Sequence, residues 1–283
     1  MSPHRSQSDA DPAPGSVPPR AGQDGAAPVA DGQSNPVLRA VALRKRYGQV
    51  EAMRDVHLDV HSGEVVALVG DNGAGKSTFV KSIAGVHEPD GGQMWLDGNP
   101  VAFRSPHDAR IAGIEVVYQD LALAPDLPVW ANLFLGRPLR LNGPLGRIGQ
   151  LNKRAMRAEA VRQLERLHIR VKSVDVRVEN LSGGQRQALA VARAVAWRRK
   201  LVIFDEPTNN LGVPEQIEVV QLIGRLAAEG TAVVIVSHNL EHVFRIAHRI
   251  SVLRNGKTVA SVETSQTTSE QVIGWITGLG VNP

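Results

Sequence analysis

Residues 65–85 read VVALVGDNGAGKSTFVKSIAG, and this stretch decides the fold. Its first five residues are apolar and mostly β-branched, which predicts a short strand buried on both faces. Residues 70–77 then follow the pattern Gly, any four residues, Gly-Lys and Ser or Thr, and an apolar helical pattern closed by Gly85 comes directly after them. This order predicts a phosphate-binding loop, because glycines let backbone N–H groups turn toward phosphate oxygens and the helix N-terminus adds partial positive charge.

The ligand expected on this loop is a nucleoside triphosphate, ATP with Mg²⁺. Lys76 is expected to pair with the β- and γ-phosphates, and Ser77 to reach the metal. A chance match to the pattern is the simpler explanation, but the strand before the loop and the helix after it argue against it. The residues of the loop predicted to contact ATP are Gly70, Asp71, Asn72, Gly73, Ala74, Gly75, Lys76, Ser77 and Thr78.

Tyr47 is a further candidate, upstream of the loop. Its aromatic ring could stack on adenine, or it could be a half-buried packing residue of a strand. The residue type alone leaves both readings open.

The composition of the 283 residues excludes several classes of function. There is no cysteine, which excludes disulfides, cysteine-ligated metals and a thiol nucleophile. The net charge of +4 is a small excess of 32 basic over 28 acidic residues, so no nucleic-acid binding is expected. No apolar run is long enough to span a membrane and no signal peptide is present, so we expect a cytosolic protein.

Two further apolar runs, residues 201–204 and 232–236, also predict buried parallel strands. Each of the three runs is followed by polar residues, and open α/β sheets bind ligands at the carboxyl edge of their strands. One site built from all three strand ends is therefore expected. Residues 37–60 alternate between apolar and polar side chains, which predicts half-buried antiparallel strands instead.

Helical spacing predicts helices over residues 76–84 and 185–197, and another that contains Met156, Ala160, Leu164 and Leu167. Residues 121–180 lack a strong strand pattern and are expected to form a helical insertion. Residues 1–36 are rich in Pro, Ala, Gly and Ser and are expected to be a disordered tail. The predicted fold is α/β, with a mainly parallel sheet, an antiparallel β subdomain and the helical insertion, all within one domain over residues 37–283.

Polar residues at the predicted strand ends complete the expected site. Asp205 could reach the hydration shell of a metal and Glu206 could orient a water molecule. His238 follows the run at residues 232–236, and Gln119 follows a further short apolar run at residues 114–117, where it could reach both the metal and the γ-phosphate. Taken singly, each has a simpler explanation: the Asp-Glu pair as a strand end that meets solvent, His238 as a structural residue, and Gln119 as a strand cap.

Residues 181–185 read LSGGQ and open the predicted helix with a Ser N-cap and two glycines. This arrangement presents N–H groups and a hydroxyl to an anion. An ordinary flexible helix start explains the same residues when they are taken alone.

In this order, these elements resemble those of an ATP-binding cassette (ABC) ATPase over nearly all of residues 37–283. The five-residue match to the family signature consists of Leu181, Ser182, Gly183, Gly184 and Gln185. The resemblance implies a P-loop ATPase that converts ATP and water to ADP and phosphate. It implies Glu206 and His238 as catalytic residues, and Ser77, Gln119 and Asp205 as metal-site residues.

The resemblance also implies that two cassettes face each other head to tail. ATP on residues 70–77 of one cassette would be covered by Ser182 and Gly184 of the other. Because the chain carries one cassette, a homodimer is expected.

Segments 70–73, 118–123, 132–137 and 206–212 are similar to those of bacterial monosaccharide importers of the ribose, xylose and fructose type. This similarity implies a peripheral position at the cytoplasmic face of the membrane, against permease subunits that receive sugar from an extracytoplasmic binding protein. The surface around Gln119 and the helical insertion would receive a coupling helix of the permease.

Two features depart from the family pattern. Gly212 stands where many cassettes have an Asp that links the two ATP sites. Many sugar importers fuse two cassettes in one chain, whereas this chain carries one.

Another importer class, such as one for amino acids, is an alternative, and a non-transport ABC ATPase is a second one. Cassettes that act in DNA maintenance usually have a very long coiled coil between the two motifs, and none separates Ser77 from Leu181. A binding module that holds ATP without turnover predicts a lost catalytic residue, yet Glu206 and His238 are both present.

Overall fold

The computed structural model describes residues 35–196 and 199–279. The predicted tail at residues 1–36 therefore lies outside the described residues, except for its last two. The strands are β1 (Leu38–Tyr47), β2 (Val50–Val60), β3 (Val65–Gly70), β4 (Gly91–Leu96), β5 (Asn99–Val101), β6 (Ile114–Val117), β7 (Leu201–Asp205), β8 (Ala232–Val236), β9 (Arg249–Arg254) and β10 (Lys257–Glu263). The helices are α1 (Lys76–Ile83), α2 (Pro106–Ala112), α3 (Val129–Leu133), α4 (Pro144–Arg147), α5 (Lys153–Arg166), η1 (Val178–Asn180), α6 (Gly183–Val195), α7 (Val213–Ala228), α8 (Leu240–Ile246), η2 (Thr264–Gln266) and α9 (Ser269–Thr277).

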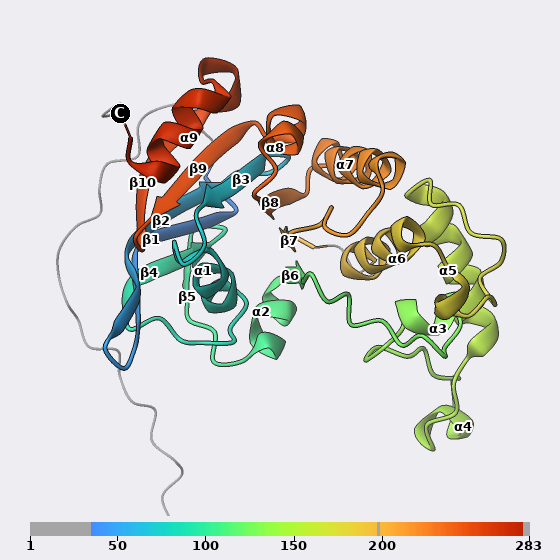
Figure 1. Ribbon diagram of the computed structural model, residues 1–283. Coiled ribbons are helices and arrows are strands. Elements are labelled where there is room, and N and C mark those ends of the chain that lie inside the picture. Colours follow the sequence, from blue (N-terminus) through green and yellow to red (C-terminus); the bar gives the residue numbers. More distant parts are fainter. Residues whose placement is uncertain (1–34, 197–198, 280–283) are drawn as a thin grey trace, which may run out of the picture. The chain divides into compact units, whose positions relative to one another are not determined.

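The strands form a sheet in the order β5-β4-β1-β2-β10-β9-β3-β8-β7-β6 (Figure 1). The half from β9 to β6 is parallel throughout, and every residue of β3 and β8 is buried. The three apolar runs are thus the buried parallel strands that their composition predicts, and the α/β fold class is confirmed.

The half from β5 to β2 is antiparallel, as the alternation in residues 37–60 predicts. β1 and β2 form a hairpin in which Leu38 pairs with Val60. This half meets the parallel half where β10 pairs with β2.

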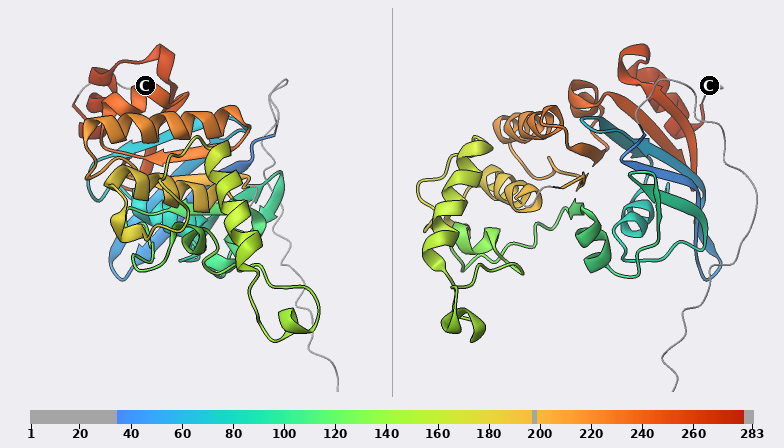
Figure 2. Two further views of the ribbon diagram at one scale, coloured as in Figure 1. Left: turned by 90° about the vertical axis from the view of Figure 1, so that its right-hand side faces the viewer. Right: turned by 180° about the vertical axis from the view of Figure 1, so that it is seen from behind.

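The core has two layers, because neighbouring side chains of a strand point to opposite faces of a sheet. Val66 and Leu68 of β3 pack in one layer with Phe79 of α1. Val65 and Ala67 belong to the other layer, which also contains residues of α6 and α7. Figure 2 shows helices on both faces of the sheet.

Residues 121–180 contain α3, α4, α5 and η1 and no strand of the sheet. Figure 1 places α3, α4 and α5 together with α6, at the end of the sheet opposite β1 and β4. None of the helices in the described part of the chain is both long enough and apolar enough to cross a bilayer.

The predicted helices differ slightly at their ends from those in the structure. α1 ends one residue early, with Ala84 as its C-cap, and Leu167 is the C-cap of α5. α6 starts two residues earlier than predicted because Ser182 caps it, and residue 197 lies outside the described ranges.

Candidate functional site

The phosphate loop connects the end of β3 to the start of α1. Its backbone is shaped by Gly75, which has φ 107° and caps α1. A Cβ at Gly75 would lie 2.6 Å from the carbonyl oxygen of Ala52, so only glycine fits there. The loop is also tied to the sheet, since Gly256 N donates to Ala74 O at 3.0 Å. It is therefore a fixed turn at the positive end of α1, where N–H groups attract anions.

Lys76 lies inside this turn. Its Nζ donates to the carbonyl oxygens of Gly70 at 2.7 Å and Asp71 at 3.0 Å. Burial lowers the pKa of Lys76, while the charges of Glu206, Asp71 and Asp205 act in the opposite direction. A partly desolvated cation thus stands between the loop and two carboxylates.

Asp205 is the last residue of β7 and is half-buried. Burial raises the pKa of Asp205, and the charge of Glu206 raises it further, against a smaller opposing effect of Lys76. Two adjacent carboxylates under these conditions attract a cation, because a cation relieves both desolvation and repulsion.

Glu206 follows directly and has φ 52°, a left-handed conformation that is uncommon for a residue with a side chain. The turn is held by Glu206 N, which donates to Val236 O of β8 at 2.9 Å. Glu206 Oε1 lies 2.8 Å from Nδ1 of His238. The second oxygen, Oε2, is buried and has no hydrogen-bond partner in the described structure.

His238 follows β8 and is 66% exposed, whereas the Glu206 side chain is only 15% exposed. The carboxylate is therefore mostly covered, and the imidazole extends toward solvent. A buried carboxylate oxygen without a partner is costly unless a ligand or water occupies the space in front of it.

A cavity of about 560 Å³ connects these groups. The predicted residues that line it are Asn72, Gly73, Ala74, Gly75, Lys76, Ser77, Thr78, Gln119, Asp205, Glu206 and His238. The structure thus brings the loop, both carboxylates, His238 and Gln119 to one edge of the sheet. Gly70 and Asp71 contribute to the loop through their backbone carbonyls and do not line the cavity.

Further lining residues were not predicted. Asn209 lies within a segment quoted for its similarity, but without a role, and Val236 ends β8. The others are Val50, Glu51 and Ala52, at the start of β2. Their position follows from contact between the β1–β2 hairpin and the loop, which no local pattern reveals.

Tyr47 ends β1 and does not line the cavity. Its ring packs edge-on against His87, with centroids 5.5 Å apart, and is 41% exposed. A role in stacking on adenine stays a prediction.

The signature residues 181–185 lie elsewhere. Ser182 caps α6 in a capping box, in which Ser182 Oγ accepts from Gln185 N at 3.2 Å and Gln185 Oε1 accepts from Ser182 N at 3.0 Å. Leu181 is buried and anchors the turn. Since Ser182 Oγ acts as an acceptor in this box, its O–H is left to donate to a ligand.

No signature residue lines the phosphate cavity. Ser182, Gly184 and Gln185 line a separate cavity of about 650 Å³, with Glu215 of α7 among its other residues. Within one chain, the signature and the phosphate loop are thus in different places.

Gly212 is the N-cap of α7 and offers no side-chain cap. A Cβ at this position would lie 2.6 Å from Oε2 of Glu215. The carboxylate of Glu215 therefore occupies the space in which an Asp side chain at position 212 would begin.

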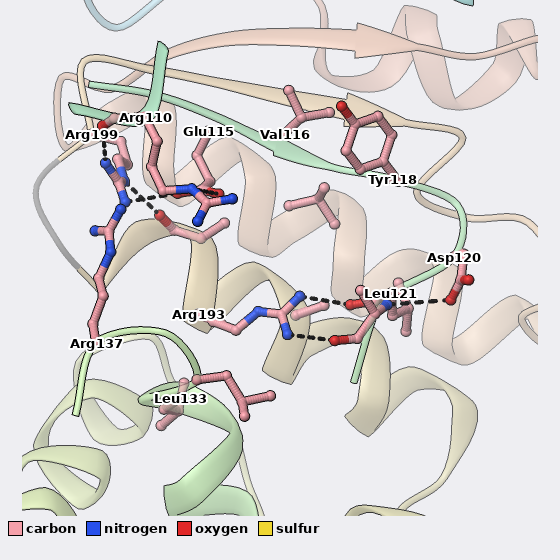
Figure 3. A pocket seen from close by; sticks show the side chains of 15 residues that line it. Arg110, Glu115, Val116, Tyr118, Asp120, Leu121, Leu133, Arg137, Arg193 and Arg199 are labelled. Atoms are coloured by element: carbon pink, nitrogen blue, oxygen red, sulfur yellow. Dashed lines mark hydrogen bonds and ion pairs between the residues drawn. The ribbon is translucent and has the colours of Figure 1, made fainter. Parts of the chain in front are cut away.

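A third cavity, of about 280 Å³, is lined by residues of β6 and by Tyr118 and Asp120, the two neighbours of Gln119, and is called here the arginine cleft. Its charged lining consists of Arg110, Arg137, Arg193 and Arg199 against Glu115 and Asp120. Figure 3 shows three of these arginines gathered around Glu115 of β6. Glu115 lies 2.7 Å from Arg199 and 3.4 Å from Arg110. Because four arginines stand against two carboxylates, the cleft carries an excess of positive charge.

Arg193 of α6 connects the cleft to the segment after Gln119 (Figure 3). Its guanidinium donates to the carbonyl oxygens of Leu121 and Ala122, both at 2.7 Å. The helix that begins at the signature is thus joined directly to the chain that leaves the phosphate cavity.

The chain matches the family model described as ABC transporter over residues 53–209. It is 44% identical to the fructose import ATP-binding protein FrcA of Rhizobium meliloti, over 86% of this chain and 94% of that protein. It is 45% identical to the xylose/arabinose import ATP-binding protein XylG of Sulfolobus acidocaldarius, over 81% and 89% of the two chains. It is 37% identical to the ribose import ATP-binding protein RbsA 2 of Streptomyces avermitilis, over 86% of this chain and only 47% of that longer relative.

Solved structures with the same fold include a nucleotide-free ATP-binding cassette from an ABC transporter. It matches with a TM-score of 0.72 and 23% identity, over 86% of this chain and 95% of that one. A dimeric bacterial ABC transporter cassette matches with a TM-score of 0.66 and 25% identity, over 80% and 98%. The family match, the identity to full-length relatives and the shared fold together show that this chain is an ATP-binding cassette of the ABC transporter family.

Proposed function

We propose that this chain is the ATP-hydrolysing subunit of an importer for monosaccharides. The observation that carries the chemistry is the 2.8 Å contact between Glu206 and His238, at the edge of the cavity that the phosphate loop also lines. The substrate class is supported by the identity of 44% and 45% to import proteins for fructose and for xylose and arabinose.

Hydrolysis would proceed by in-line attack of water on the γ-phosphoryl group. Glu206 is suited to polarise that water, because its buried Oε2 has no partner and its Oε1 is held by His238. His238 is exposed enough to reach the γ-phosphate. Lys76 and the N–H groups of the loop would stabilise the charge that develops on the phosphate oxygens.

The donor set fits Mg²⁺. The Ser77 hydroxyl, the Gln119 amide oxygen and the Asp205 carboxylate line the same cavity, and Mg²⁺ prefers such oxygen ligands. The described residues contain no group of three or more acidic, His or Cys side chains that could hold a metal alone. Mg²⁺ at this site would therefore depend on ATP phosphates and water for the rest of its shell, and would supply neutralising charge there.

A second copy of the chain would complete the site. The signature lies in its own cavity, with the Ser182 hydroxyl able to donate, so it can act only on ATP bound to another cassette. The dimer of a bacterial cassette with this fold supports this arrangement. Two symmetric copies would give two composite sites.

The arginine cleft would receive the permease. It opens beside Gln119 and has four arginines against two carboxylates, so the segment that docks there is expected to carry an acidic side chain. In this proposal the chain would be a peripheral subunit at the cytoplasmic face of the membrane, and an extracytoplasmic protein would deliver sugar to the permease.

The test is a deletion of the gene in its own organism. Uptake of labelled fructose, xylose and ribose is measured, with a labelled amino acid for comparison. We expect the loss of at least one sugar uptake and its return with the intact gene, but not with Lys76→Ala. Unchanged sugar uptake together with lost amino acid uptake would assign the chain to another importer class.

A further inference from the structure

We propose that the segment between α3 and α5, residues 137–154, binds the anionic phospholipid headgroups of the membrane that holds the permease. This segment is called here the basic hairpin. The inference relies on the proposed function only to bring the chain to a membrane, and it adds a direct contact with lipid.

The basic hairpin is closed on itself. Leu141 N donates to Gln150 O at 3.0 Å, and Asn152 N donates to Leu139 O at 2.8 Å. A Cβ at Gly146 would collide with the carbonyl oxygen of Leu141, so the fold of the hairpin requires glycine there. Figures 1 and 2 show its tip, the short helix α4, extending away from α3 and α5. The hairpin is thus an ordered projection and not an open loop.

The charge of this region has one sign. Residues 127–158 contain no Asp or Glu. The basic residues in the same range are Arg137, Arg140, Arg147, Lys153, Arg154 and Arg157. Like charges at this density repel one another and attract an anionic surface.

Four of these cations have no partner among the residues that the structure describes. Arg157 pairs with Asp175 at 2.7 Å. Over the described ranges, the exposed side chains of Arg140, Arg147, Lys153 and Arg154 form no ion pair or hydrogen bond. Their counter-charge must come from beyond the described residues or from solvent.

Lys153 and Arg154 also stand in the first turn of α5, which has no acidic residue. A cation there is disfavoured by the partial positive charge of the helix N-terminus. By contrast, α7, α8 and α9 each carry a Glu in their first turn. The two cations therefore do not serve the stability of their own helix.

An apolar side chain accompanies the charges. Ile148 follows Arg147 and is 80% exposed, and Leu151 is 36% exposed. Basic residues next to an exposed apolar residue are typical of segments that lie at the boundary between headgroups and acyl chains. This combination favours a lipid surface over an acidic protein loop, which would pair with the charges but leave Ile148 in water.

The test uses the full chain and flotation of phospholipid vesicles, either of phosphatidylcholine alone or with about one third phosphatidylglycerol. We expect binding to the anionic vesicles that weakens as salt is raised. The variant Arg140→Gln with Arg147→Gln should bind them at least about tenfold more weakly, since each cation near such a surface contributes roughly fivefold. Ile148→Ser should weaken binding further.

The matched control removes two other exposed cations, Arg104 and Arg245, which have no ion pair or hydrogen bond of their side chains within the described ranges; each is changed to Gln. This control should bind anionic vesicles like the unchanged chain. All variants should keep ATP turnover, which shows that they fold.

No preference of the intact chain for anionic vesicles, or an equal loss in the control, would overturn the proposal. Binding of Arg140, Arg147, Lys153 and Arg154 to an acidic permease segment, without any dependence on lipid, would overturn the proposal as well. A chain that binds the vesicles but does not hydrolyse ATP would instead count against the proposed function.

Discussion

Glu206 combines a strained backbone, at φ 52°, with a buried carboxylate oxygen that has no partner. Each feature costs stability, the backbone by about 1–3 kcal/mol. Such features persist where a function needs them, and Glu206 is one of the residues that line the cavity of the phosphate loop.

Glu206→Gln is therefore expected to lower ATP turnover at least about a hundredfold, because an amide cannot polarise the attacking water as a carboxylate does. ATP affinity should be kept, since Lys76 and the loop are unchanged. Phosphate release and nucleotide binding measure the two effects separately. Glu51→Gln is the control, because Glu51 lines the same cavity but is exposed and pairs with Arg54 at 3.4 Å. Equal losses in both variants would contradict the role of Glu206.

Asp205 should make the chain less stable as the pH rises. Its pKa is raised by burial above the ordinary value of 3.8, so the folded state holds the proton more tightly than the unfolded state does. The stability from this proton is present below pH 3.8 and is lost as the pH rises through the raised pKa.

Asp205→Asn removes this cost. Without ATP and Mg²⁺, the variant should be more stable at neutral pH by roughly 0.5–2 kcal/mol, and this advantage should shrink as the pH falls toward the acid range. Thermal unfolding at a series of pH values measures the difference. An advantage that grows toward acid pH would show that another group controls the effect.

At the scale of elements, the described part of the chain has two capping boxes that differ in predicted function. Ser182 and Gln185 start α6, and Thr268 and Gln271 start α9. Because the two caps make the same reciprocal pair of hydrogen bonds, they separate the structural role of a cap from its role in ATP binding.

Ser182→Ala and Thr268→Ala should each cost about 1 kcal/mol of stability. Only Ser182→Ala should also lower ATP turnover, by roughly tenfold or more, because its hydroxyl is expected to donate to a phosphate of the partner's ATP. Unfolding and phosphate release are measured on both variants. Equal turnover in the two would remove Ser182 from the site.

Much of the fold could be predicted at this scale. Buried strands such as β3 and β8 are visible as apolar runs, and Ser182 as a cap, because these signals are local. No element was predicted for residues 249–263, although β9 pairs with β3 at the centre of the sheet. The place of Glu51 in the cavity and of Glu115 among arginines depends on pairing between distant segments, which the sequence of one segment does not encode.

At the scale of the whole molecule, a cassette whose signature lies away from its phosphate loop would supply half of each of two ATP sites in the proposed dimer. ATP bound between two copies should hold them together, and hydrolysis should release them. The fold of a dimeric bacterial cassette is consistent with this view.

The Glu206→Gln variant should therefore form a dimer with ATP and Mg²⁺ and stay monomeric without them. Light scattering after size exclusion measures the mass of 30.4 kDa per chain or twice that value. Addition of Lys76→Ala to the same variant should abolish the dimer, since it removes ATP binding. A dimer that is independent of ATP would contradict a nucleotide-controlled interface.

β6 lies at the edge of the sheet and, among the strands of the described residues, pairs with β7 alone. Glu115 points into the arginine cleft and Gln119, four residues on, lines the phosphate cavity, a separation of about 13 Å at the rise of an extended chain. An edge strand can slide along its single neighbour at less cost than a central strand, which would have to break hydrogen bonds on two sides. A partner that displaces Glu115 in the cleft would thus move β6 along β7 and shift Gln119, two residues beyond the end of the strand, without any rearrangement of the core.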